Sequence, residues 1–170
     1  MPAFTGKGDN GFTDLQGGKR VRKDHPVVDL VGEIDELSAW IGLARSECKN
    51  SGLNDILEQI QKHLSVMMGM ISSYNVNTTL GQKQFAQSLE MVEAWVKEYE
   101  KKIMLPTSFQ QAGSSKDGAY LNMLRTISRR IERKAVSIFI ETNSDTVLML
   151  TYLNRLSTLF YLLWMYADQS

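Results

Sequence analysis

The fold is decided by the stretch Arg125-Thr126-Ile127-Ser128-Arg129-Arg130-Ile131-Glu132-Arg133, which combines an apolar and a charged pattern. Around it, apolar residues recur at spacings of three and four, which is the period of a helix with one face in a core. These residues are Leu121, Leu124, Ile127, Ile131, Ala135 and Ile138. The stretch therefore predicts an amphipathic helix with a separate charged face.

The same apolar period recurs outward from this helix along most of the chain, and only three prolines interrupt it. The helices predicted from it span residues 26–48, 53–72, 84–102, 119–141 and from 144 or 145 to about 167. A polar stretch, 73–82, and a long loop, 103–118, separate them, and no strand-like alternation is visible. The prediction is an all-α fold, a five-helix bundle that occupies residues 26–170 as one domain.

Residues 1–25 differ from the bundle, because glycines alternate there with lysines and arginines. This composition predicts a flexible basic arm. Glycines let backbone N–H groups wrap an anion, and nearby hydroxyl and ammonium groups add donors for a polyphosphate. Such donors are Thr5, Thr13, Lys7, Lys19 and Lys23. The arm matches neither the Walker A nor the dinucleotide pattern, so a merely solvated N-terminus stays open as an alternative.

The charged face of the central helix consists of Arg125, Arg129, Glu132 and Arg133, which fall within one arc of about 100°. Guanidinium groups on one stripe repel each other unless anions neutralise them. Arginine also binds phosphate and carboxylate with two parallel hydrogen bonds, whereas a charged face that only keeps a protein soluble usually carries Lys and Glu. The stripe therefore indicates an anion site, and a solvated charged face is the alternative.

Three polar residues lie in or beside apolar stripes: Asp35, Asn154 and Arg155. Each needs a partner if it is buried, so each is either a structural hydrogen-bonding residue or a ligand-binding group. The lone His63 is expected to be an ordinary residue at the helix surface or core edge. No Glu pair with Glu-x-x-His occurs, so a di-iron bundle is not supported.

Composition limits the function classes further. The 170 residues include 19 basic and 19 acidic side chains, and this zero net charge argues against a broad surface for nucleic acid or anionic membranes. The single Cys48 excludes an internal disulfide, and the first ten residues lack an apolar signal core, so we expect a cytoplasmic protein. Residues 146–167 are long enough to span a membrane, but Asn154 and Arg155 near their centre favour a bundle core.

Five motifs, in the same order along almost the whole chain, resemble the PduO-type ATP:corrinoid adenosyltransferases. They are Phe4-Thr5-Gly6-Lys7-Gly8-Asp9-Asn10-Gly11-Phe12-Thr13, Gly17-Gly18-Lys19-Arg20-Val21-Arg22-Lys23-Asp24, Gly32-Glu33-Ile34-Asp35-Glu36-Leu37-Ser38 with Ile41-Gly42-Leu43-Ala44, Arg125-Thr126 with Arg129-Arg130-Ile131-Glu132-Arg133, and Tyr152-Leu153-Asn154-Arg155-Leu156-Ser157. Each motif is weak alone, but five in register are specific.

The resemblance implies a ferritin-like, up-down bundle that assembles as a homotrimer with active sites between subunits. It implies an enzyme that transfers the 5′-deoxyadenosyl group of ATP to Co(I) of a corrinoid and releases triphosphate, with Mg²⁺ bound mainly through ATP. An electron-supplying reductase and an adenosylcobalamin-dependent enzyme are the further partners that it implies.

The resemblance also implies the site residues. Those of the arm, residues 1–25, are Thr5, Gly6, Lys7, Gly8, Asp9, Gly11, Thr13, Lys19 and Lys23. Those of a neighbouring subunit are Arg125, Arg129, Glu132, Arg133 and Asn154, with Arg129, Glu132 and Asn154 in the catalytic role. Asp35 would pair with Arg125 across the interface.

One segment departs from the family, which usually has Phe-x-[Leu/Ile]-Pro-Gly-Gly before the fourth helix. Here the stretch is Ile103-Met104-Leu105-Pro106-Thr107-Ser108, and the loop is longer. The aromatic expected beneath the corrinoid is missing from that place, and Phe109 or Phe12 is the candidate substitute. Two alternatives to an enzyme stay open: an ATP- or corrinoid-binding carrier or sensor, and a helical module whose arginine face docks an acidic partner.

Overall fold

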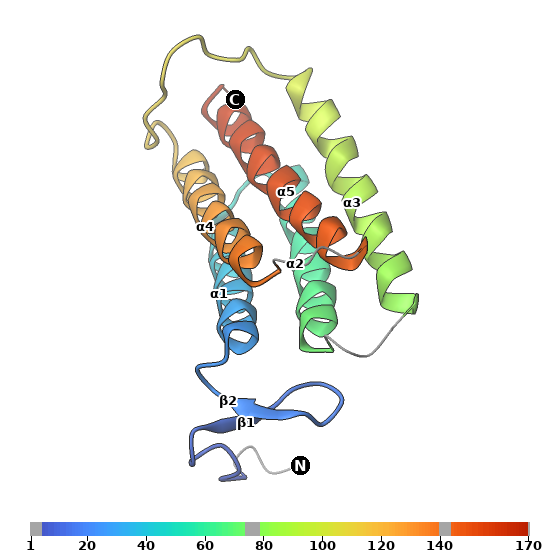
Figure 1. Ribbon diagram of the computed structural model, residues 1–170. Coiled ribbons are helices and arrows are strands. Elements are labelled where there is room, and N and C mark those ends of the chain that lie inside the picture. The colour runs from blue at the N-terminus through green and yellow to red at the C-terminus, as the bar shows by residue number, and fades with distance from the viewer. Residues whose placement is uncertain (1–4, 74–78, 140–143, 170) are drawn as a thin grey trace.

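The computed structural model of the chain describes residues 5–73, 79–139 and 144–169 (Figure 1). The helices in these ranges are α1 (Pro26–Glu47), α2 (Ser51–Ser72), α3 (Thr79–Glu100), α4 (Lys116–Ile138) and α5 (Ser144–Gln169). They run alongside one another as a bundle, which confirms the predicted all-α, five-helix architecture.

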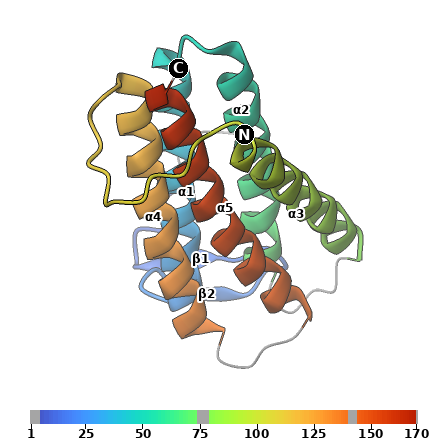
Figure 2. The same ribbon diagram turned by 90° about the horizontal axis from the view of Figure 1, so that it is seen from above.

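The helices form a ring around a shared core (Figure 2). α1 contacts α2 and α4, α5 contacts α3 and α4, and α2 and α3 complete the ring. Every helix contributes fully buried apolar side chains to this core, among them Ile34, Leu57, Phe85, Leu124 and Phe160. Burying a side chain of this size contributes about 1.5–3 kcal/mol, so the core is the main source of stability.

Local signals fix several helix ends. The Nδ1 atom of His25 accepts a hydrogen bond from the Val27 N–H at 3.2 Å, and Pro26 occupies the first turn of α1, as predicted. α3 begins at Thr79 rather than at residue 84. α4 ends at Ile138, whereas its predicted end at residue 141 lies outside the described residues.

The prediction that the arm contains no strands was wrong. Strands β1 (Phe12–Asp14) and β2 (Arg20–Arg22) pair antiparallel, with Thr13 opposite Val21. Gly17 and Gly18 form the connection with φ angles of 93° and 82°, which glycine adopts without strain. Strands of three residues are too short to show alternation in a sequence, so the hairpin was not visible there.

The hairpin and the loop between α3 and α4 lie at opposite ends of the bundle. In Figure 1 the hairpin lies below the N-terminal end of α1, while the loop crosses the opposite end, near the C-terminus of α5. A hydrogen bond of 2.7 Å from the Ser73 hydroxyl to Gln16 Oε1 joins the hairpin to the end of α2.

α5 provides a large share of the core. Within the described ranges, its segment Thr146–Gln169 is the one stretch long and apolar enough to cross a membrane, but 56% of its apolar part is buried in the bundle. A central core helix satisfies the same length and composition test. Its apolar character therefore needs no membrane to explain it.

Candidate functional site

The cations of α4 divide between two environments. Arg130 bonds to Glu33 and Glu36 of α1 at 2.7 and 2.8 Å, so its charge is neutralised within the chain. Arg129 and Arg133 are exposed, and neither makes a hydrogen bond or ion pair with a described residue. Arg130, which lies outside the predicted arc, is thus paired within the chain, whereas Arg129 and Arg133 of the arc are not paired with a described residue.

Arg125 and Arg129 share a cavity of about 200 Å³ on the side of α4 that faces α5. The described residues of α5 that complete its lining are Ser157, Thr158 and Tyr161. Burial, followed by the nearby Arg129 charge, lowers the pKa of the Arg125 guanidinium, which nevertheless stays protonated. Two guanidinium groups with no carboxylate in this lining form a site that attracts an anion.

Arg125 is held in place by its surroundings. Its Nε donates to Asn122 Oδ1 at 2.9 Å, and its guanidinium carbon lies 5.8 Å from the centre of the Trp164 ring. The contact with the ring face supports the charge without neutralising it. The remaining guanidinium N–H groups therefore stay available to a ligand.

Glu132 and Asn154 meet between α4 and α5. The Asn154 Nδ2 donates to Glu132 Oε1 at 2.9 Å, and its Oδ1 accepts from Arg155 at 2.9 Å. Arg155 in turn bonds to Glu93 of α3 at 3.3 Å. This chain of contacts accounts for the two polar residues within the apolar α5, and it fixes the orientation of the Asn154 amide.

The arm folds its glycine-rich segment back onto Lys23. A Cβ atom at Gly8 would lie 3.2 Å from the Lys23 ammonium, and the Lys23 N–H donates to the Gly11 carbonyl at 2.9 Å. Arg20 donates to the Lys7 carbonyl at 2.7 Å and so holds the loop in place. Backbone groups and the Lys23 ammonium thus lie close together here, and a side chain at Gly8 would require the end of the Lys23 side chain to shift slightly.

Of the other candidate residues of the arm, Thr5, Gly6, Lys7 and Asp9 precede or belong to this loop and Thr13 lies in β1, whereas Lys19 lies in the connection between β1 and β2. Thr5, Lys7, Asp9 and Lys19 are exposed, whereas Gly6 and Thr13 are half-buried. Gly6 and Gly11 have φ angles of 67° and 80°, which favour glycine. The predicted anion-binding residues of the arm are therefore brought to one small structure.

Within a single chain, the arm does not meet the arginines. No hydrogen bond or ion pair joins residues 5–25 to the described parts of α4 or α5, and the hairpin lies beyond the end of the bundle (Figure 1). Asp35 is exposed on α1 and has no partner among the described residues, so the predicted pair with Arg125 does not form within one chain.

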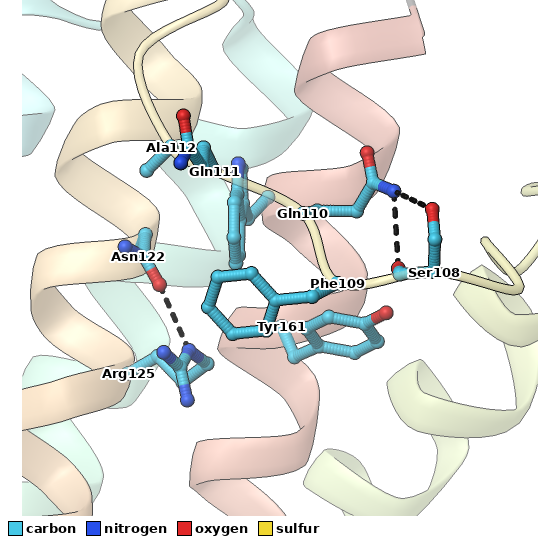
Figure 3. Close-up of a pocket in the computed structure, with 9 residues that line it drawn as sticks. Ser108, Phe109, Gln110, Gln111, Ala112, Asn122, Arg125 and Tyr161 are labelled. Atoms are coloured by element: carbon cyan, nitrogen blue, oxygen red, sulfur yellow. Dashed lines mark hydrogen bonds between the residues drawn. The ribbon is translucent and has the colours of Figure 1, made fainter.

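A second cavity, of about 530 Å³, adjoins the first at Arg125 and Tyr161 (Figure 3). Its described lining residues are Ser108, Phe109, Gln110, Gln111, Ala112, Asn122, Arg125, Tyr161 and Trp164. This volume lies in the range of small-molecule sites. Sequence reasoning missed the aromatic residues of α5 here, because their helical spacing resembles that of ordinary core residues.

The departure from the family pattern also has a structural counterpart. Ile103 is buried, whereas Phe109 is 93% exposed at the mouth of the larger cavity. Phe12 is 40% exposed and belongs to the hairpin at the other end of the bundle. Of the two candidate substitutes, Phe109 is therefore the one beside a cavity in this chain.

His63 is a structural residue buried in the core. Its Nδ1 lies 3.1 Å from the Tyr152 hydroxyl, and its ring stacks on Trp95 at 6.1 Å between centres. Burial lowers its pKa to about 4, so it is neutral at pH 7. The described residues hold no cluster of three or more His, Cys, Asp or Glu side chains arranged for a metal ion.

Comparison with known proteins places these features in a family context. The family model described as cobalamin adenosyltransferase matches residues 3–167. The corrinoid adenosyltransferase PduO of Salmonella typhimurium is 32% identical over 164 residues, which cover 96% of this chain and 48% of the relative. The corrinoid adenosyltransferase of Bacillus subtilis is 35% identical over 166 residues, covering 95% of this chain and 83% of the relative.

Solved structures agree with the sequence comparison. A variant of the PduO-type ATP:corrinoid adenosyltransferase of Lactobacillus reuteri, complexed with cobalamin and ATP, superimposes with a TM-score of 0.85 at 27% identity. The match covers 99% of this chain and 91% of that one. The chain spans about half the length of the PduO relatives from Salmonella typhimurium and Citrobacter freundii.

Proposed function

The chain belongs to the cobalamin adenosyltransferase family, and on this basis we propose that it transfers the 5′-deoxyadenosyl group of ATP to the cobalt of a corrinoid. The observation that carries the proposal is the pair Arg125 and Arg129, which face one cavity without a carboxylate in its described lining. A triphosphate is the anion that ATP brings to such a pair. The adjoining cavity of about 530 Å³, which shares Arg125 and Tyr161 with the first, supports a site for the second substrate beside the nucleotide.

The reaction asks little covalent chemistry of the protein. Co(I) is a nucleophile that attacks the 5′ carbon of the ribose, so a cobalt–carbon bond forms while the C5′–O bond breaks. The triphosphate leaves with the bonding electron pair. The protein contributes positioning of the two substrates and neutralisation of the charge that develops on the leaving group.

Three side chains carry the catalytic role in this proposal. Arg129 forms charge-assisted hydrogen bonds with the triphosphate, because its guanidinium is exposed and has no described partner. Asn154, oriented by Glu132 at 2.9 Å, contacts the nucleotide beside it. Arg125 and Arg133 add positive charge, and Mg²⁺ enters with ATP on the phosphate oxygens.

The second half of the nucleotide site comes from the arm of a neighbouring subunit. The separation of the arm and the arginines in one chain supports this division, since each half lacks the other. We infer a homotrimer in which the arm, residues 1–25, of one subunit reaches the bundle, residues 26–170, of the next. Asp35 then pairs with Arg125 across the interface.

The chemistry also defines the surroundings of the enzyme. Co(I) requires an electron donor, so a reductase supplies the reduced substrate, and an enzyme that uses adenosylcobalamin receives the product. The single cysteine of the chain suits a reducing compartment, which supports the proposal that the protein acts in the cytoplasm.

The experiment that tests the function is spectroscopic. The protein is incubated with chemically reduced cobalamin and Mg-ATP, and the absorbance of a light-sensitive cobalt–carbon bond is followed together with released triphosphate. The proposal expects both products in equal amounts. ATP binding without either product would favour a carrier or sensor instead. The sequence support for this alternative is Ile103, which stands where the family has an aromatic residue.

A further inference from the structure

The glycine-rich loop of the arm, residues 6–11, has no hydrophobic support of its own. It contains no apolar side chain, and its residues are exposed or half-buried. Two backbone hydrogen bonds of 3.2 Å shape it. The Asp9 N–H donates to the Gly6 carbonyl, and the Gly11 N–H donates to the Gly8 carbonyl. A loop with so few contacts opens easily unless a side chain from a fixed element holds it.

Arg20 of β2 joins this loop to the hairpin. Its Nη2 donates to the Lys7 carbonyl at 2.7 Å and to the Asn10 Oδ1 at 3.1 Å. Its Nη1 donates to the Asp14 Oδ1 of β1 at 3.1 Å. Among the described residues, no other side chain from outside the loop donates a hydrogen bond to it. One planar guanidinium therefore connects the loop to both strands of the hairpin.

The hairpin from which Arg20 extends is itself anchored to the bundle. Val21, its neighbour in β2, is buried, and Leu15 packs against the core. The Gln16 Oε1 accepts a hydrogen bond from the Ser73 hydroxyl, which lies just beyond the end of α2. Arg20 therefore holds the loop against a fixed strand.

The charge of Arg20 is matched within the chain. Asp14 forms an ion pair with it, and the Phe12 ring centre lies 5.9 Å from its guanidinium carbon. Lys7 and Lys23, by contrast, form no ion pair with a described residue. An anion at this loop therefore meets the unmatched charge of the lysines, whereas Arg20 acts through the shape of the loop.

We propose that Arg20 is a positioning residue, which holds residues 6–11 in the shape that receives the triphosphate of ATP without touching the nucleotide. The inference rests on the proposed function and adds a residue that supports its nucleotide site. Affinity falls in proportion to the fraction of molecules in the competent shape, so a preformed loop favours binding. Saturating ATP closes the loop in every molecule, so the transfer step is expected to be unaffected by Arg20.

The first test measures the loop without nucleotide. In Arg20→Ala, the amide protons of Asp9 and Gly11 should exchange with solvent roughly threefold faster or more, as followed by NMR, because the loop opens more often. Arg22→Ala is the matched control, since Arg22 lies on the same strand and its side chain bonds to Asp24 alone among the described residues. Its loop amides should exchange as in the wild type. Equal exchange in Arg20→Ala and the wild type would overturn the inference.

The second test combines calorimetric titration with Mg-ATP and steady-state kinetics. Arg20→Ala loses two hydrogen bonds to the loop, so its Kd and KM for ATP should rise roughly tenfold, while kcat stays within about twofold of the wild type. Arg20→Lys keeps the charge but lacks the planar fork, so it should bind ATP nearly as weakly. Arg22→Ala should keep the wild-type values.

The outcomes separate this inference from the proposed function. If the wild type binds ATP and forms product, an unchanged Kd in Arg20→Ala, a wild-type Kd in Arg20→Lys or a large loss of kcat at saturating ATP overturns the inference alone. If the wild type binds no ATP, the proposed function fails, and unchanged amide exchange in Arg20→Ala would overturn the inference as well. Thermal melting verifies that each variant is folded, since the pair of Arg20 with Asp14 is about half exposed and adds little stability.

Discussion

Replacing Arg129 by Ala is expected to remove activity without weakening the fold. Replacing its neighbour Arg130 by Ala is expected to weaken the fold slightly and to leave activity unchanged. Arg129 has no described partner, so its loss should change the free energy of unfolding by no more than about 0.5 kcal/mol. A hydrogen bond to a charged group contributes about 1.5–3 kcal/mol, and a guanidinium can make two such bonds to the triphosphate. The expected loss in kcat/KM is therefore about a hundredfold or more.

Arg130 supplies the matched control on the same helix. It bonds to Glu33 and Glu36 and is about half exposed, so Arg130→Ala should cost no more than about 1 kcal/mol, or roughly 2–4 °C in Tm, and leave the KM for ATP unchanged. Steady-state assays with varied ATP and thermal melts of both variants measure the two effects. If Arg129→Ala keeps kcat/KM within about threefold of the wild type, the argument for the phosphate site is refuted.

Three further predictions concern packing, titration and assembly. Gly118→Ala would bring a Cβ atom into a clash with the Asp168 Oδ1, so the Tm should fall by several degrees. The fall in Tm should be smaller in an Asp168→Ala background, and equal falls in the two backgrounds would exclude the clash. Because the folded-state pKa of His63 is about 4 and its ordinary value 6.5, its contribution to stability is complete above pH 6.5 and is lost as the pH falls towards 4. The free energy of unfolding in urea, measured between pH 4 and 6.5, should depend less on pH in His63→Gln than in the wild type. Parallel curves for the two proteins would contradict the lowered pKa of His63. Asp35→Arg should reduce the mass seen by sedimentation to that of a monomer through repulsion with Arg125, whereas an unchanged mass would argue against that contact.

Hydrophobic periodicity was sufficient to predict the helices, because burial of one face decides where a helix lies. Leu124 and Ile131 show this, since both belong to the apolar stripe predicted for residues 119–141 and both are fully buried. The hairpin was missed because glycine and charged residues dominate it, and its pairing depends on the turn at Gly17 and Gly18. Local turn geometry leaves little trace in a hydrophobic pattern.

The candidate site was predictable in its charges but not in its shape. The helical spacing of Arg125 and Arg129 was enough to place both on one face of α4. The larger cavity combines residues 108–112 of a loop with parts of two helices, so only the path of the loop in space brings them together. Phe109 was therefore named from a family pattern, while its companions Tyr161 and Trp164 were not named at all.

The distance between the hairpin and the arginines in one chain has a genetic consequence. In the proposed homotrimer, a subunit with a defective hairpin would still offer an intact arginine face to its neighbour, and a subunit with a defective face would still offer an intact hairpin. Random co-assembly of two such inactive chains in equal amounts would give about a quarter of the sites two sound halves. Two alleles that each encode an inactive chain would then restore activity when both are expressed in the same cell.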